Sequence, residues 1–304
     1  MKMTQPVLLS SSIAQRFRQA VVLIHGLDSA QDTWSGVCSA FAREGRPCLA
    51  IDLRGHGTSE LGPVDEFSSV AIVADIYATV RAHGVRPPFV LVGHSMGGRI
   101  AMSYAAAHPS DIAALVIEDM DLRLRDEPEE TAELTSRLRC FNRTFATWSD
   151  CKDALMSFGY EPNRIDRWRG SRLWCRADGM WWSSINPFAA FLARKHVLAS
   201  ADGRTAFAVI ARDCTFAVHL LVAGVGSACE ENDDEGVKGM QAAMPRLRVR
   251  RFDRAGHSIH NTAESDFLCY LRSSVFEMTT PPSRSALALQ PFHGMVERIC
   301  AVQK

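Results

Sequence analysis

Hydrophobic residues in the first 120 positions gather in four short, continuous runs. The runs cover residues 20–24, 48–51, 89–92 and 113–117, and aliphatic side chains dominate them. An uninterrupted apolar run of this length is typical of a strand that is buried on both faces, as in a parallel sheet. Between the runs, the residue pattern predicts helices over about 33–43, 66–83 and 96–108. This alternation predicts an α/β fold, with a mostly parallel sheet and helices on both faces.

The pattern changes after Asp121. Residues 122–200 contain no strand-like run but many arginines and five of the six tryptophans, which indicates a helical insertion. The alternation of helices and strands then resumes. It predicts a helix over 204–212, a strand over 216–223, a helix over 236–244, a strand over 247–252 and a last helix over 262–276. The tail from residue 279 shows no clear periodicity until about residue 295.

Composition excludes several classes of protein. The chain has 304 residues, of which 47% are hydrophobic, and 34 basic residues balance 34 acidic ones. A normal apolar fraction without net charge argues against bulk disorder, and the chain has no general basic field for nucleic acid. No stretch approaches 18 apolar residues free of charge, so we expect no transmembrane helix.

Cysteine usage and the first residues bear on the compartment. The nine cysteines are scattered, odd in number and never in a CxxC pair. This pattern argues against a disulfide scaffold or a zinc site and favours a reducing compartment, so we expect a cytoplasmic protein. The first twenty residues lack acids and carry three basic residues, which fits either a mitochondrial presequence or an ordinary leading strand.

The strongest chemical signal is the GxSxG sequence over residues 93–97, between a predicted strand and a predicted helix. A serine on such a tight turn is lifted above the sheet, and Gly93 and Gly97 leave room for the two elements to close. The alternative is a glycine-rich turn that binds phosphate. However, the sequence GHSMGG matches neither GxGxxG nor a P-loop.

Several motifs in a fixed order resemble the α/β-hydrolase superfamily. They are HG at 25–26, DxRGHGxS at 52–59, GHSMGG at 93–98 and AGHSIH at 255–260. The resemblance covers about residues 20–278. It implies a hydrolase core over 1–121 and 204–278, a helical lid over 122–203 and a C-terminal tail over 279–304. The 304 residues then form one core domain split by the lid, because Ser95 precedes the insertion and His257 follows it.

The resemblance also implies roles for individual residues. Ser95 matches the nucleophile and His257 the general base, whose imidazole takes the serine proton. The backbone amides of Leu27 and Met96 match the oxyanion hole. His25 and His56 resemble residues that order loops, and His260 is expected in a loop or pocket. His94 is expected to point away from Ser95.

The third member of a catalytic triad is an acid that orients the histidine, and it has two candidate regions. In most members of the family it follows the strand at 216–223, where Ser227 stands at the expected position and Glu230, Glu231, Asp233 and Asp234 come shortly after. Some members carry it at the end of the preceding core strand, where Asp119 matches. We favour Asp119, with Glu118 and Asp121 near enough to compete.

The insertion offers a substrate pocket. Trp181, Trp182 and Phe188, with His25 and His94, are candidate pocket residues, although these aromatic side chains could equally pack the lid against the core. Its arginines could attract an acidic or CoA-linked substrate, but a solvated surface is the simpler interpretation.

The resemblance predicts a serine hydrolase that acts on a small-molecule acyl substrate, first of all a carboxylic ester, without metal or cofactor. A thioesterase, lipase, amidase or carbon–carbon hydrolase would use the same groups. A non-catalytic binding protein on this fold is the alternative from a different class. The sequence leaves the oligomeric state open.

Overall fold

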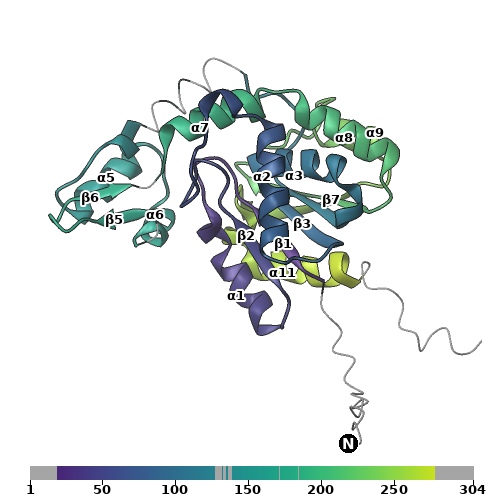
Figure 1. Cartoon of the computed structure of the whole chain (residues 1–304), viewed down its shortest axis with the longest axis horizontal. Coiled ribbons are helices and arrows are strands. Elements are labelled where there is room, and N and C mark those ends of the chain that lie inside the picture. Colours follow the sequence, from purple (N-terminus) through teal and green to yellow (C-terminus); the bar gives the residue numbers. More distant parts are fainter. Residues whose placement is uncertain are drawn as a thin grey trace, which may run out of the picture.

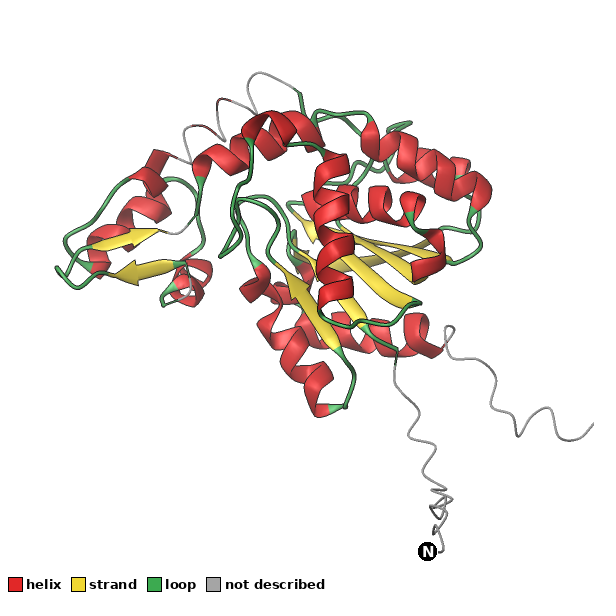
Figure 2. Cartoon of the chain, viewed as in Figure 1, coloured by secondary structure: helices red, strands yellow, loops and turns green. Residues whose placement is uncertain are grey.

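A computed structural model describes residues 19–126, 132, 135, 139–170, 172–183 and 185–277. The possible presequence or leading strand before residue 19, most of residues 127–138 of the predicted lid and the tail from 279 lie outside the described residues. The core is a six-stranded sheet between two layers of helices (Figures 1 and 2). Among the described residues, no helix is both long and apolar enough to cross a membrane.

The central sheet is entirely parallel. In spatial order its strands are β2 Cys48–Ile51, β1 Val21–Ile24, β3 Phe89–His94, β4 Ile112–Glu118, β7 Ala217–Val225 and β8 Arg248–Gly256. Each strand begins within one residue of its predicted start. The apolar runs of β1, β3 and β4 are buried on both faces as expected, whereas β2 and β8 are partly exposed. The predicted fold class is confirmed.

The helices form two layers, each with its own apolar core. Helices α2 Ser69–Ala82, α3 Met96–Ala107, α8 Asp202–Asp213 and α9 Val237–Ala243 cover one face of the sheet. Helices α1 Ser35–Arg43 and α11 Glu264–Tyr270 cover the other. Residues alternate between the two cores along β1, where Val22 and Ile24 face one layer and Val21 and Leu23 the other.

A short helix that the sequence did not predict precedes the last predicted helix. A short helix α10, Ile259–Thr262, comes first, and Ala263 then breaks it with φ −142° and ψ 47°. Helix α11 follows and continues into a π-helical turn, Leu271–Phe276. The break at Ala263 separates the short helix that carries His260 from α11.

The expectation that the insertion contains no strand is wrong. Strands β5 Leu173–Cys175 and β6 Trp181–Ser183 pair antiparallel, joined by a turn in which Gly179 has φ 83°. They were missed because three-residue strands carry too little alternation, although Asp178-Gly179 is a hairpin signal. Helices α5 Trp148–Ser157, α6 Pro162–Trp168 and α7 Pro187–Ala193 complete the described part, which has an apolar cluster of its own.

The insertion is held to the core loop that follows β1. The Arg172 guanidinium donates to Asp32 Oδ1 from Nε at 2.9 Å and from Nη2 at 2.5 Å. The Tyr160 hydroxyl donates to Asp28 Oδ2 at 2.9 Å. Leu27 packs against both the core cluster and the cluster of the insertion. The insertion therefore contacts the chain directly after the HG motif.

The close approach of α3 to β1 predicts an effect on stability. A Cβ added at Gly97 would lie 2.5 Å from the carbonyl oxygens of Ile24 and His25, whereas one at Gly98 would lie at least 3.1 Å from its neighbours. We expect Gly97→Ala to lower the free energy of unfolding by about 1–3 kcal/mol more than Gly98→Ala, because backbone cannot move aside. Urea denaturation followed by circular dichroism measures this difference. Equal losses in the two variants would contradict it.

Candidate functional site

Ser95 lies on the sharp turn between β3 and α3. Its backbone has φ 52° and ψ −122°, a region that residues other than glycine rarely occupy. The Ser95 amide donates to Glu118 O at 2.8 Å, and its carbonyl accepts from the Gly98 amide at 2.7 Å. A Cβ at Gly93 would lie 2.2 Å from Gly97 O, so the turn needs glycine at 93. The turn has the geometry that the sequence predicted.

The HG loop lies beside this turn, because β1 and β3 are neighbours with Ile24 opposite Gly93. A Cβ added at Gly26 would lie 3.1 Å from the Ser95 Cβ. Leu27 is the next residue after Gly26, and Met96 is the first residue of α3. The structure thus brings the two segments with the predicted oxyanion amides together at one edge of the sheet.

Asp119 and His257 form a direct pair. Asp119 follows β4 with φ 49°, is fully buried, and its Oδ2 lies 2.7 Å from His257 Nδ1. Its other bonds come from the Ser227 hydroxyl at 2.6 Å and from the Ala223 and Ala228 amides. Burial alone would raise the pKa of Asp119, but His257, Ser227 and the amides outweigh burial and hold it below its ordinary value.

The other candidate acids are occupied elsewhere. Glu231 forms an ion pair with Arg251, and Asp233 accepts from the Glu235 amide at 2.7 Å. Glu230 is exposed, with its carboxylate 3.9 Å from Arg123. Ser227, which stands where most of the family has the acid, donates to Asp119 instead.

The two acids that flank Asp119 also have partners of their own. Glu118 binds His260, with Oε1 2.8 Å from Nδ1. Asp121 binds the guanidinium groups of Arg123 and Arg125 at 2.8 and 3.0 Å. Asp119 is therefore the candidate acid that the described contacts place on His257.

His94 connects Ser95 to the loop of His257. Its Nε2 lies 3.1 Å from His257 O, and the two rings are 4.7 Å apart between centroids. His94 directly precedes Ser95, so the chain around His257 lies against the nucleophile turn. His94 is buried and acts here as a structural contact between the two segments.

His25 orders the loops around it. Nδ1 donates to Gly26 O at 2.7 Å, and Nε2 accepts from the Leu53 amide at 3.1 Å, which defines a neutral ring. Burial, followed by the charge effect of nearby His56, lowers the pKa of His25 well below its ordinary value. The ring is fully buried, in agreement with a loop-ordering role rather than an open pocket position.

The candidate pocket aromatics of the insertion lie on two elements, with Trp181 and Trp182 on β6 and Phe188 on α7. Trp181 packs on Trp148, with ring centroids 4.8 Å apart, and Trp182 is 40% exposed opposite Trp174. Figure 1 draws β6 at the far end of the insertion, away from β3. Phe188 is 49% exposed on α7. The structure does not bring Trp181 or Trp182 to Ser95.

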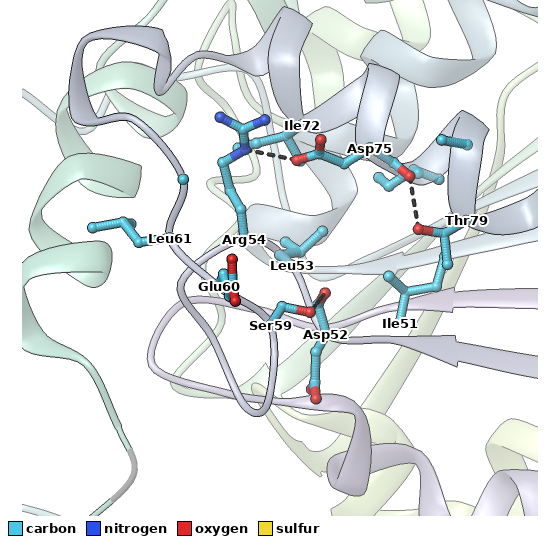
Figure 3. Close-up of a pocket in the computed structure, with 13 residues that line it drawn as sticks. Ile51, Asp52, Leu53, Arg54, Ser59, Glu60, Leu61, Ile72, Asp75 and Thr79 are labelled. Atoms are coloured by element: carbon cyan, nitrogen blue, oxygen red, sulfur yellow. Dashed lines mark hydrogen bonds and ion pairs between the residues drawn. The ribbon is translucent and has the colours of Figure 1, made fainter.

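The DxRGHGxS motif builds a loop next to a separate cavity (Figure 3). The Asp52 carboxylate accepts from the Gln31 amide at 2.7 Å and from the Thr58 amide at 3.0 Å, and Arg54 Nε lies 2.6 Å from Asp75. The cavity has a volume of about 350 Å³, and all its lining residues lie between Ile51 and Thr79. We therefore assign the motif to loop structure beside the HG loop, where the His56 ring lies 5.2 Å from the His25 ring between centroids.

Two interactions of the site were not foreseen from the sequence. They are the bond from Ser227 to Asp119 and the pairing of Glu118 with His260. The sequence contains both residues, a serine in the usual acid position and a second histidine in AGHSIH. However, it does not indicate which carboxylate either side chain contacts.

Sequence comparisons agree with the fold. Residues 19–139 match the family model described as alpha/beta hydrolase fold. The chain is 33% identical over 101 residues to monoacylglycerol lipase abhd6-B of Xenopus laevis, covering 33% of this chain and 30% of the relative. It is 36% identical over 102 residues to the sn-1-specific diacylglycerol lipase ABHD11 of Mus musculus, covering 33% and 32%.

A bacterial relative extends the match slightly. The chain is 35% identical over 117 residues to 2-succinyl-6-hydroxy-2,4-cyclohexadiene-1-carboxylate synthase of Enterobacter sp. (strain 638), covering 38% of this chain and 43% of that protein. In all three comparisons the match spans less than half of the relative's own length.

Solved structures extend the likeness over most of the chain. An E-2-(acetamidomethylene)succinate hydrolase superposes with a TM-score of 0.68 and 21% identity, covering 83% of this chain and 90% of that one. An esterase from a marine microorganism gives 0.67 and 18%, covering 84% and 94%. At this identity the likeness shows the fold. Residues 19–139 match the alpha/beta hydrolase fold family model, and the solved structures show that the same fold extends over most of the chain.

Proposed function

We propose that this protein is a serine hydrolase that cleaves a carboxylic ester through an acyl-enzyme on Ser95. The observation that carries the proposal is the 2.7 Å bond between Asp119 and His257, in a loop packed against the strained turn of Ser95. A hydroxyl needs an oriented base to become a nucleophile, and a buried carboxylate on Nδ1 supplies that orientation.

The proton has a defined route. Since Nδ1 of His257 donates to Asp119, Nε2 is left as the base that takes the Ser95 proton during attack on the carbonyl. The amides of Leu27 and Met96 stabilise the oxyanion, and His257 returns the proton to the leaving alcohol. Water activated by the same nitrogen then attacks the acyl-enzyme and releases the carboxylic acid. No step requires a metal or cofactor.

The insertion over 122–203 is the proposed lid. Arg172 and Tyr160 attach it to residues 28–32, directly after Leu27. This attachment supports a lid at the edge of the sheet where the acyl group would enter. Phe188 and Phe191, half exposed on α7, are available to an apolar substrate.

Ester cleavage is favoured over the rival reactions by the names of the relatives, two of which are acylglycerol lipases. A thioesterase or a carbon–carbon hydrolase would use the same three side chains and would differ in the leaving group. A binding protein without catalysis would not need the Asp119–His257 pair. Assays with p-nitrophenyl esters and acyl-CoAs distinguish these functions.

We expect the purified protein to hydrolyse p-nitrophenyl esters and Ser95→Ala to lose at least about 10³-fold in kcat, because the nucleophile is gone. Release of p-nitrophenol across acyl chain lengths, with acyl-CoAs in parallel, measures both rate and leaving-group preference. Ser103→Ala, on the same helix, is the matched control and should keep wild-type turnover. Turnover that survives in Ser95→Ala would refute the mechanism.

The assignment of the acid has its own test. Asp119→Asn should lower kcat by about 10³–10⁴-fold, since the amide no longer holds the His257 tautomer or stabilises its charged form. Glu230→Gln and Glu231→Gln should stay within about twofold of wild type, because neither carboxylate contacts His257 in the structure. Near-normal turnover in Asp119→Asn would remove Asp119 from the triad.

Asp119 also predicts a pH dependence of stability. Because the pKa of Asp119 is lowered in the folded protein, its ionised form stabilises the fold fully above the unfolded pKa of about 3.9. This contribution is lost as the pH falls through the folded pKa. The excess unfolding free energy of wild type over Asp119→Asn should therefore be largest near pH 7 and shrink below about pH 4, as urea denaturation would show. A difference independent of pH would contradict it.

A further inference from the structure

A second carboxylate–histidine pair lies next to the proposed triad. Glu118 Oε1 lies 2.8 Å from His260 Nδ1 and accepts from the His260 amide at 2.9 Å, and Glu118 Oε2 lies 2.9 Å from the same Nδ1. Glu118 is fully buried and His260 almost so. A buried carboxylate without such partners is costly, so this pair is a built contact rather than a chance approach.

The other edge of the His260 ring is fixed too. Its Nε2 lies 2.9 Å from the Thr33 hydroxyl and 3.0 Å from Asn261 Nδ2, and Asn261 Nδ2 also donates to Thr33 Oγ1 at 2.9 Å. The ring stacks on Trp34 at 3.9 Å between centroids. Since Nε2 accepts from its neighbours, Nδ1 carries the proton, and it donates this proton to Glu118. The ring therefore has one tautomer and one orientation.

The backbone around the pair connects directly to all three proposed catalytic residues. Glu118 directly precedes Asp119, and its carbonyl accepts from the Ser95 amide at 2.8 Å. His260 follows His257 by three residues across the start of α10, and its ring lies 5.1 Å from that of His94. One end of the 257–260 segment is thus bonded to Asp119 and the other end to the adjacent Glu118.

We propose that Glu118 and His260 are positioning residues that set the place of His257 relative to Ser95 and Asp119. The bond from His257 to Asp119 fixes one end of the 257–260 segment, where His94 also contacts the His257 carbonyl. The attachment of His260 to Glu118 fixes the other end, so the segment cannot turn about the first bond. The proposal rests on the proposed function, because it describes how the base of that reaction is held.

The two ring nitrogens of His260 allow a matched test. Asparagine places its amide donor near the position of Nδ1 and can keep the bond to Glu118, whereas glutamine reaches toward Thr33 and loses that bond. Both changes remove the stacking on Trp34. Any difference between His260→Asn and His260→Gln therefore reports the link to Glu118 and not the loss of the ring.

We expect His260→Gln and Glu118→Gln to lower kcat for the p-nitrophenyl ester by about 10–100-fold with KM within twofold, as is typical when a group that orients a functional histidine is removed. His260→Asn should recover at least fivefold of the loss seen in His260→Gln. His219→Asn, at a buried histidine bonded to Tyr270 at 2.8 Å, is the control and should keep wild-type kcat at a similar thermal midpoint. Wild-type kcat in His260→Gln, or equal losses in His260→Asn and His260→Gln, would overturn the proposal.

A readout without substrate separates this proposal from the proposed function. The proton between His257 Nδ1 and Asp119 should give a low-field ¹⁵N-coupled NMR signal that Asp119→Asn abolishes. We expect this signal to broaden or exchange faster in His260→Gln than in wild type and His260→Asn. An unchanged signal in His260→Gln would refute the positioning role, even for a wild-type protein that hydrolyses no ester. Loss of turnover in Ser95→Ala tests the proposed function alone.

Discussion

The parallel register of three neighbouring strands places the HG loop, Ser95 and Asp119 at one edge of the sheet. Ile24 lies opposite Gly93, and His94 lies opposite Glu118, so the chains leaving β1, β3 and β4 emerge side by side. Parallel strands end at a common edge, and side chains that follow them can meet without long loops. The HG loop, Ser95 and Asp119 each come directly after one of these strands. The strained backbone at Ser95 and Asp119 lies at this edge, where the sheet holds it in place.

The sequence predicts this core well because its signal is local. Each buried strand is a run of apolar residues, and the turn at Ser95 requires glycines that can be read directly from the chain. His257 was found by a motif of the same kind. The acid was harder to assign, because the choice depends on which carboxylate faces His257. That depends on the positive φ of Asp119 and on the bond from Ser227, and neither follows from residue pattern.

The insertion shows the limit of pattern analysis. Its strands have three residues each, and its aromatic residues serve both its own core and its surface. Trp181 is partly buried against Trp148 while the adjacent Trp182 is exposed, a difference that follows from strand geometry and not from residue type. Arg172 illustrates the same point. Its side chain is buried and bonded to the loop after β1, although the segment contains many other arginines. A count of arginines could not identify it.

Leu27 packs against the core cluster and against the cluster of the insertion. The position of the Leu27 amide in the HG loop therefore depends on packing against the insertion as well as against the core. Under the proposed function, an exchange of the insertion during evolution would have to preserve or rebuild the packing around Leu27. Changes of substrate range and of transition-state stabilisation are then coupled in this chain. We expect a new specificity to arise first by changes on the exposed side of the insertion, far from Leu27.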